Sequence, residues 1–258
     1  MIRSRPSRHR SPNPIPSLSL RLNKFISRCG LASRRTADEL IVQGKVLVNA
    51  EIVTELGAAV NEHQDVVEVD GKVCKLPSEP IYIALNKPRG FLVTVGDPFG
   101  RKTVMQLLKG IRRRVYPVGR LDYDSEGLLL FTDDGEMAFR LAHPRYGVRK
   151  VYSVKVKGKF PKEELARFEE GIRLEDGHLA RARASLRRQD ETASMLSLEL
   201  TEGRKREIRR MCRILGYQVL SLRRTKYDQI TLTGIPPGHW RYLTPQEVHL
   251  LKQRVALA

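Results

Sequence analysis

The sequence has few cysteines, and none of them is spaced for a metal site or a redox motif. Its three cysteines, Cys29, Cys74 and Cys212, lie far apart. Zinc sites and thiol redox motifs typically place cysteines as C-x-x-C pairs. The six histidines show no H-x-x-x-H spacing either. We therefore expect no bound metal, and we interpret the cysteines as small buried side chains in a reducing compartment.

Long hydrophobic runs are also missing. The apolar stretch from Gly127 to Phe131 is far shorter than the roughly 20 residues that a membrane-spanning helix needs. The N-terminus has no apolar segment of the kind that directs secretion. We therefore expect a protein that is neither inserted in a membrane nor exported, with a cytoplasmic location.

Acidic residues are scarce relative to basic ones. The chain of 258 residues has 47 Lys and Arg against 29 Asp and Glu, a formal net charge of +18. Such an imbalance makes a compact protein repel itself, and it is typical of chains with a polyanionic partner. Membrane binding would favour an amphipathic helix with exposed aromatics, but the only Trp, Trp240, follows a Pro/Gly-rich segment. Nucleic acid is therefore the favoured partner.

The first 19 residues contain no acid and little that can form a core. Their basic residues include Arg3, Arg5, Arg8 and Arg10, set among Ser and Pro. This composition predicts a disordered basic tail over residues 1–19. A solvated tail and an arm that holds phosphates both agree with it.

A small domain is expected over residues 20–75. Leu22, Phe25, Ile26 and Cys29 have helical spacing, and Ser33 can cap a second helix that ends before Gly44. Short strands are expected afterwards, at Val46–Asn49, Ile52–Thr54 and Val66–Val69.

Basic residues of this domain gather on its helical part. They are Lys24, Arg28, Arg34, Arg35 and Lys45. Two short helices followed by a small sheet, with the segments 22–26, 33–35 and 44–49, resemble the S4 RNA-binding domain. The resemblance implies that these five side chains bind RNA, and the alternative is an ordinary solvated helix face.

Residues 76–80 are interpreted as a linker, and residues 81–258 as a larger second domain. Strands and helices alternate there without regular crossover helices, which favours an α+β fold with a mixed, mainly antiparallel sheet and flanking helices. The predicted strands are Ile81–Leu85, Leu128–Thr132, Val151–Val156, Leu196–Leu200 and Tyr217–Leu222. The predicted helices are Thr103–Leu108, Glu136–Ala142, Lys162–Glu170 and Lys205–Leu215.

The run from Pro117 to Gly135 is the most informative stretch. It is a polar loop, Gly-Arg-Leu-Asp-Tyr-Asp-Ser-Glu, which opens into an apolar strand. From the residues alone, Asp122 has the character of a turn or cap residue. The run resembles the G-R-L-D motif and Gly-Leu-Leu-Leu strand of the pseudouridine synthases, in the subgroup that carries an N-terminal S4 domain. The segments 86–90 and 97–101 resemble further parts of that family, and Ser125 stands where Thr is frequent.

The resemblance implies a role for each of several residues. Asp122 becomes the catalytic carboxylate, either as a nucleophile at C1′ or as a base that leads to a glycal. The segment 202–211 resembles a third motif, in which Arg209 pairs with the catalytic Asp and Ile208 packs on the uracil. Tyr152 stacks on the base, and Arg120 helps to extrude the nucleotide. Arg204, Arg206 and Arg210 are expected to bind RNA.

Each of these roles has a plainer alternative. Tyr152 shares a strand face with Val154 and Val156, which is typical of a core tyrosine. Ile208, Met211, Cys212 and Leu215 form an apolar helical stripe with Arg209 at its edge. The alternative is that the arginines of this helix all bind phosphates, and we keep this alternative open for Arg209.

The function implied is conversion of a uridine in ribosomal RNA, or in a pre-ribosomal particle, to pseudouridine by a flipped-nucleotide mechanism. Large-subunit 23S RNA is favoured over 16S RNA. No phosphate-binding glycine loop is found, so no cofactor is expected, and a methyltransferase is disfavoured. The alternative is a non-catalytic S4-type RNA-binding or ribosome-assembly protein. A monomer is expected.

Overall fold

The computed structural model describes residues 19–257, and these residues form two compact units that divide between Ser78 and Glu79. Nearly all of the tail predicted for residues 1–19 lies outside the described residues. Within the described range, no helix has both the length and the apolar character needed to cross a bilayer.

The first unit is built from a helix pair and two small sheets. Helix α1 (Leu22–Arg28) buries Leu22, Phe25 and Ile26, as its spacing predicts. Ser33 caps helix α2 (Arg34–Val42) by accepting a hydrogen bond from the Thr36 amide, 3.0 Å long. The strands are β1 (Ser19–Arg21), β2 (Val46–Val48), β3 (Glu51–Ile52), β4 (Ala59–Asn61), β5 (Val67–Val69) and β6 (Lys72–Val73). Strands β1 and β4 pair with each other, and the other four form a sheet in the order β3-β2-β5-β6.

The second unit is organised around one mixed sheet, which confirms the predicted fold class. Its strands are β7 (Tyr82–Lys87), β8 (Tyr116–Val118), β9 (Glu126–Thr132), β10 (Lys150–Lys157), β11 (Ile172–Arg173), β12 (Leu179–Ala180), β13 (Arg183–Gln189), β14 (Ala193–Leu200), β15 (Val219–Tyr227), β16 (Ile230–Thr231) and β17 (Trp240–Tyr242). The main sheet has the order β13-β14-β10-β15-β9-β7-β17, and β11 pairs with β12 separately. Every adjacent pair is antiparallel except β15 and β9.

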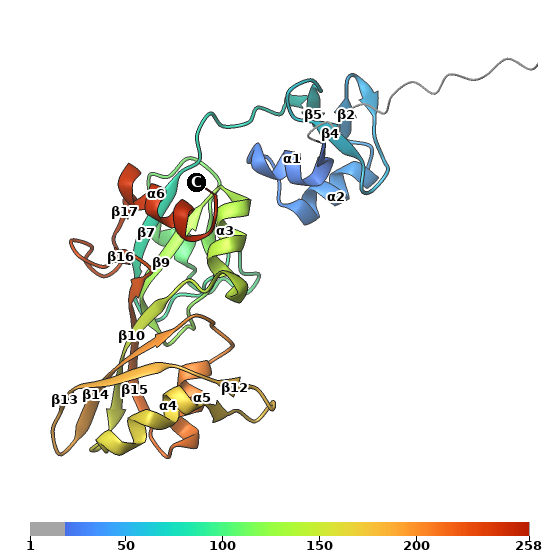
Figure 1. The fold of residues 1–258 in the computed structure, drawn as a ribbon. Helices are drawn as coiled ribbons and strands as arrows, with labels where there is room; N and C mark the ends of the chain where they lie inside the picture. Colours follow the sequence, from blue (N-terminus) through green and yellow to red (C-terminus); the bar gives the residue numbers. More distant parts are fainter. Residues whose placement is uncertain (1–18, 258) are drawn as a thin grey trace, which may run out of the picture. The chain divides into compact units, whose positions relative to one another are not determined.

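Helices cover both faces of this sheet. They are α3 (Gly135–Ala142), α4 (Ala166–Glu170), α5 (Glu207–Ile214) and α6 (Pro245–Arg254), with 3-10 turns η1 (Val104–Leu107), η2 (Pro144–Tyr146) and η3 (Lys162–Leu165). Figure 1 shows α3 and α6 beside β7 and β9, and α4 and α5 beside β13, β14 and β15. Because both faces are covered, successive residues of β9 enter two different cores, Leu129 and Phe131 into one and Leu128 and Leu130 into the other.

Several predicted elements need correction. The helix expected at 103–108 is only the 3-10 turn η1, and the one expected at 162–170 is η3 followed by α4. The helix expected from Lys205 begins at Glu207, because Arg206 has a left-handed backbone with φ 52°. The strand predicted at Tyr217–Leu222 is β15, which runs from Val219 to Tyr227. The strands and α-helices of this unit that were not predicted are β8, β11, β12, β13, β16, β17 and α6.

The two halves of the sheet meet at a short parallel seam. Strands β9 and β15 pair only at Glu126 with Arg223 and at Gly127 with Arg224. A Cβ added to Gly127 would stand 2.2 Å from the Arg224 carbonyl oxygen, and Gly127 has φ +106°. Only glycine permits this close approach of the two backbones. The G-R-L-D loop enters β9 directly at the seam.

Candidate active site

A cleft of about 400 Å³ brings the three sequence motifs of the second unit together. Its size falls in the range of small-molecule sites. Among the residues predicted as functional, its walls include Arg120, Asp122, Tyr152, Arg204, Arg206 and Ile208. The motif at β9, the strand β10 and the start of α5 are distant in sequence, so their convergence is a property of the fold.

The loop that carries Asp122 is held from below by a buried lysine. Lys87, the last residue of β7, is fully buried, and its ammonium group donates to three backbone carbonyls. These belong to Pro88 at 3.1 Å, Asp122 at 3.1 Å and Ser125 at 2.7 Å. Burial lowers the pKa of Lys87 to about 8, an effect that the charge of Asp122 partly opposes. The ammonium group therefore fixes the backbone of the turn and leaves the Asp122 carboxylate free.

Asp122 itself is half-buried and lines the cleft. No basic side chain of residues 19–257 forms an ion pair with its carboxylate. Ser125 lies beside it, with a buried hydroxyl that has no hydrogen-bond partner in the described chain. The cleft wall thus contains one carboxylate without an ion-pair partner and one buried hydroxyl without a hydrogen-bond partner among the described residues.

A second carboxylate of the same loop connects it to α5. Asp124 receives two hydrogen bonds from the Arg206 guanidinium, at 3.1 and 3.2 Å. Arg209 donates to the Asp124 backbone carbonyl at 3.1 Å and forms an ion pair with its carboxylate at 3.2 Å. The resemblance implied that Arg209 pairs with Asp122, and the structure pairs it with Asp124. The reason is that the turn from Asp122 to Ser125 presents Asp124 to the first turn of α5.

The charges of this clamp shift the pKa values of its members. Burial alone would raise the pKa of Asp124, but the hydrogen bonds from Arg206 and the charge of Arg209 hold it below its ordinary value. Burial lowers the pKa of Arg209, and the charge of Asp124 opposes this. The clamp therefore keeps both groups charged next to the cleft.

The apolar walls of the cleft come from β10 and α5. Tyr152 is 8% exposed and Ile208 5% exposed, and both belong to the main core as well as to the cleft. Tyr152 is thus a core tyrosine and a cleft residue at once, so the two interpretations of its strand do not exclude each other. The apolar stripe of α5 is confirmed, since Ile208, Met211, Cys212 and Leu215 are all buried.

Arg210 lies outside the cleft and forms ion pairs with two acidic residues. It bonds Glu175 at 2.8 Å and Asp176 at 3.1 Å, and Arg213 also pairs with Glu175. With Lys205, Arg206, Arg209 and Tyr217, Arg210 lines a neighbouring groove of about 780 Å³. Its expected role in RNA binding would require RNA phosphates to compete with Glu175 and Asp176.

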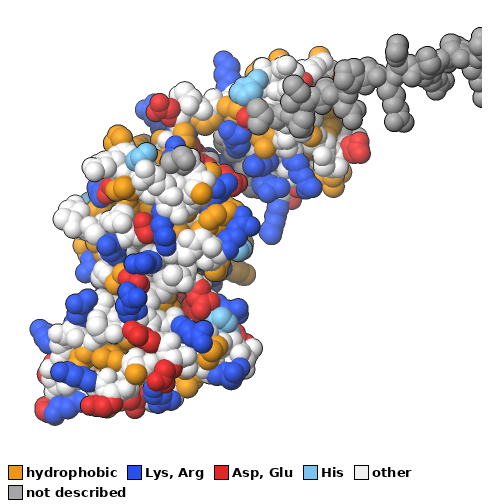
Figure 2. Space-filling view, in the orientation of Figure 1, with side chains coloured by type: hydrophobic (Ala, Val, Ile, Leu, Met, Phe, Trp, Pro, Cys, Tyr) orange, Lys and Arg blue, Asp and Glu red, His pale blue; other side chains and the backbone are white. Residues whose placement is uncertain are grey.

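Four of the five basic residues predicted in the first unit lie on its two helices, and Lys45 lies just ahead of β2. Arg34 and Arg35 are exposed in the first turn of α2, Lys45 is exposed ahead of β2, and Lys24 is partly buried on α1. Arg28, at the end of α1, pairs with Glu62. Figure 2 shows Lys and Arg side chains gathered over α1 and α2.

Sequence reasoning assigned no role to Lys87, Asp124 or Ser125. Lys87 gave a signal, because it is a charged residue two positions after the apolar run from Ile81 to Leu85. Asp124 and Ser125 gave none beyond their place in the loop. The contacts of Asp124 are with α5, more than 80 residues later.

Comparisons with known proteins identify both units. Residues 81–213 match the family model for RNA pseudouridylate synthases, and residues 20–66 match that for the S4 domain. The ribosomal large subunit pseudouridine synthase B of Bacillus subtilis is 47% identical over 90% of this chain and 95% of its own. An uncharacterized RNA pseudouridine synthase of Aquifex aeolicus is 44% identical over 93% of this chain and 96% of its own.

A solved structure agrees with these sequence relatives. A crystal structure of a pseudouridylate synthase, 30% identical, covers 90% of this chain and 99% of its own with a TM-score of 0.64. The chain therefore belongs to the RNA pseudouridylate synthase family, in a form that carries an S4 domain ahead of the synthase domain.

Proposed function

We propose that this enzyme isomerises a specific uridine of ribosomal RNA, with 23S RNA favoured over 16S RNA, and that Asp122 is its catalytic carboxylate. The single observation that carries the proposal is the unpaired Asp122 carboxylate in a cleft lined by Tyr152, Ile208 and Arg120. The large-subunit preference is supported by the Bacillus subtilis relative, whose name states that substrate class.

The cleft suits a nucleoside that has left its stack. The uracil ring would lie between the Tyr152 ring and the Ile208 side chain, and its ribose would face Asp122. Arg120, exposed at the mouth of the cleft, would occupy the space that the flipped nucleotide leaves in the RNA. The Ser125 hydroxyl would donate its free hydrogen bond to the bound nucleoside.

The reaction needs no redox change. The N1–C1′ bond breaks, the base turns, and a C5–C1′ bond forms. The C5 proton leaves to solvent, and N1 gains a proton. Asp122 would act either by attack on C1′ or by removal of a ribose proton toward a glycal, and each route needs the carboxylate ionised. The Asp124 clamp would supply positive charge from Arg206 and Arg209 close to the reacting group.

We propose that the S4 unit spans residues 20–75, that residues 76–80 are a linker and that the synthase domain spans residues 81–258. The S4 unit would supply affinity for RNA. Arg34, Arg35, Lys24, Lys45 and Arg28 would contact phosphates, which fix position without reading sequence. Arg204 and Arg206 would add phosphate contacts at the cleft itself. A monomer would suffice for an asymmetric RNA site.

The test uses ribosomal RNA transcripts that carry tritium at uridine C5. The purified full chain is incubated with unmodified 23S or 16S RNA without additives, and release of label to water is followed. We expect release from 23S RNA in an amount that corresponds to one or a few sites, and mapping of pseudouridine then names the position. Release from 16S RNA alone would contradict the large-subunit assignment. No release from either RNA would favour the assembly-protein alternative.

A further inference from the structure

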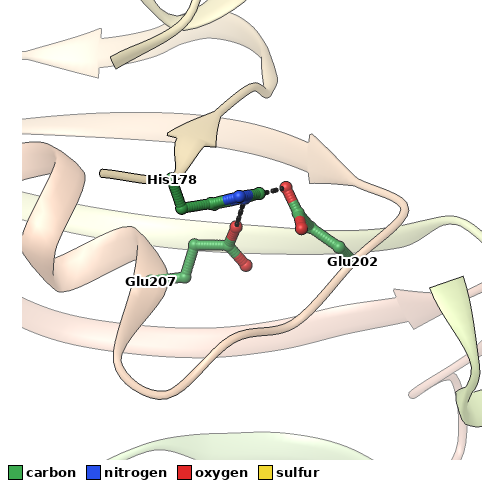
Figure 3. A group of neighbouring side chains, drawn as sticks. All are labelled: His178, Glu202 and Glu207. Carbon is green, nitrogen blue, oxygen red and sulfur yellow. Dashed lines mark hydrogen bonds and ion pairs between the residues drawn. The ribbon is translucent and has the colours of Figure 1, made fainter. Parts of the chain in front are cut away.

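A histidine and two glutamates converge beside the cleft, and the two glutamates also line it. Figure 3 shows His178, Glu202 and Glu207 pointing toward one another. His178 lies in the turn ahead of β12, Glu202 in the loop after β14, and Glu207 at the start of α5. The His178 Nε2 atom is 3.0 Å from Glu202 Oε1 and 3.9 Å from Glu207 Oε1. One ligand atom from each residue falls within 4.8 Å of the others.

Glu207 carries the observation that a hydrogen-bonded cluster alone does not explain. Its side chain is 3% exposed, and its Oε2 atom accepts a hydrogen bond from the Arg204 amide at 2.9 Å. Its Oε1 atom is buried, is aimed at His178 and accepts no hydrogen bond from any described residue. The only ion-pair partner of this oxygen among the described residues is His178, 3.9 Å away. A buried carboxylate oxygen without a hydrogen bond is costly, and a bound cation would remove that cost.

We propose that His178, Glu202 and Glu207 form a binding site for one divalent transition-metal ion, of which Zn²⁺ is the best chemical match. One imidazole nitrogen with two carboxylate oxygens suits Zn²⁺, whereas Mg²⁺ and Ca²⁺ prefer oxygen ligands alone. With metal–ligand bonds of about 2.1 Å, two ligands of a tetrahedral ion lie about 3.4 Å apart. The two measured distances from His178 Nε2 bracket that value, so small side-chain rotations complete the site.

One neighbouring group favours binding of a metal ion, and two nearby cations lower the affinity. The Arg204 amide already orients the Glu207 carboxylate from its second oxygen, which is a common support for a metal ligand. The Lys150 ammonium lies nearby but donates to the carbonyls of Val148 and Thr201. Arg204 Nε is 3.7 Å from the second oxygen of Glu202. These two cations weaken the attraction for a metal, so we expect affinity below that of a four-ligand structural zinc site.

The ion would link parts of the chain that lie 24 or more residues apart. It would connect the turn ahead of β12 to the loop and helix start that carry Arg204, Arg206 and Ile208. This wall of the cleft would then be more rigid with metal than without it. The sequence predicted no metal site because no local spacing indicates one. His178 lies 24 residues before Glu202, so the three ligands form no short motif.

The test measures metal binding by the full chain, expressed without a histidine tag and stripped with a chelator. Titration with Zn²⁺ is followed by calorimetry, and titration with Co²⁺ by visible absorption. We expect one ion per chain and a thermal midpoint that rises with Zn²⁺ concentration. Glu202→Gln and His178→Ala should each weaken binding by about ten-fold or more. His249→Ala, a change of an exposed histidine on α6, should leave binding unchanged.

This test measures metal binding and not enzyme activity. Its result therefore does not depend on whether the proposed function is correct. Circular dichroism shows whether each variant is folded, and the stoichiometry and Co²⁺ spectrum of the wild-type chain stand without any variant. If the wild-type chain binds no Zn²⁺, the cluster is a hydrogen-bonded group only, and the proposal is wrong. Equal binding by folded His178→Ala would likewise overturn it, as an adventitious ion only.

Discussion

Two carboxylates of one turn have opposite surroundings. Asp122 has no ion-pair partner among the described residues, while Asp124, two positions later, holds the guanidinium groups of Arg206 and Arg209. Lys87 fixes the turn through backbone carbonyls and so leaves both carboxylates free for these different tasks. At the scale of single residues, the site therefore separates Asp122, the carboxylate that we propose as catalytic, from Asp124, the carboxylate that binds the two arginines.

Removing the charge of Asp124 tests this division. Asp124→Asn keeps the shape of the side chain but weakens its hold on Arg206 and Arg209. We expect turnover to fall about ten-fold and stability to fall by about 1 kcal/mol, since the side chain is partly exposed. Single-turnover tritium release and urea unfolding measure the two effects. The control is Asp176→Asn, which breaks a comparable pair with Arg210 outside the cleft and should leave turnover near wild type.

Lys87 predicts a pH dependence of stability. Its pKa is about 8 in the folded chain against an ordinary value of 10.5, so the unfolded chain binds the extra proton between these pH values. Stability contributed through this group therefore rises as the pH increases from about 8 to 10.5. The free energy of unfolding of wild type should therefore increase relative to that of Lys87→Met as the pH rises over that range. A difference that stays constant with pH would contradict the burial argument.

The sequence predicts some of these residues and not others, for a physical reason. Asp122, Arg120, Tyr152 and Ile208 lie in recognisable local motifs, and the structure gathers all four in one cleft. Their catalytic roles stay predictions. The ion pair of Arg209 is with Asp124 and not with Asp122, because the choice between them depends on how the turn faces α5, and that orientation has no local signature in the sequence.

At the scale of elements, the seam between β9 and β15 places the G-R-L-D loop opposite α5. It pairs only two residues of each strand, and it depends on the missing side chain of Gly127. The loop that holds Asp122 lies directly before the first of these residues. The position of Asp122 relative to Arg209 thus depends on the integrity of the seam.

Gly127→Ala should damage the seam. Its Cβ would overlap the Arg224 carbonyl oxygen, and φ +106° is unfavourable for alanine, so we expect a loss of about 2 kcal/mol or more. Urea unfolding measures the loss. The matched control is Gly96→Ala, where the added Cβ meets no atom within 4 Å and φ is not in the left-handed region. Equal stability of the two variants would show that the close approach is unimportant.

Elements were predicted well where their hydrophobic pattern was complete. Strands β9 and β10 and helix α1 follow their patterns closely. Helix α6 was missed although its start carries a capping box, with Thr244 and Glu247 bonded to each other's backbones. The mixed polar pattern of α6 gives little periodicity, since its docking depends mainly on Leu251, so the cap was the only local signal.

At the scale of the whole molecule, the excess positive charge lies mainly in the second unit: residues 79–258 have 35 Lys and Arg against 21 Asp and Glu, whereas residues 19–78 have eight of each. Many arginines of the second unit are paired with acids, as Arg210 and Arg213 are, whereas Arg34 and Arg35 of the first unit form no ion pair among the described residues. Free exposed cations are the ones that release counterions from RNA. The first unit should therefore contribute more affinity than its share of the charge.

Reversal of these two charges tests that statement. The double change Arg34→Glu and Arg35→Glu should weaken RNA binding and reduce the dependence of affinity on salt by roughly two phosphate contacts. The matched control is Arg187→Glu with Arg188→Glu, an adjacent exposed pair on β13 that changes the net charge equally. Filter binding over a range of salt concentrations measures both. Equal losses would assign the effect to overall charge rather than to the S4 unit.

The most direct test of the account is Asp122→Asn. The substitution keeps size and shape but removes the ionised carboxylate, while the Lys87 contacts to the backbone of the turn remain. With enzyme in excess over tritium-labelled RNA, we predict that label release falls about a thousand-fold or more and that RNA affinity changes little. Release at the wild-type rate by a folded Asp122→Asn chain would contradict the central claim.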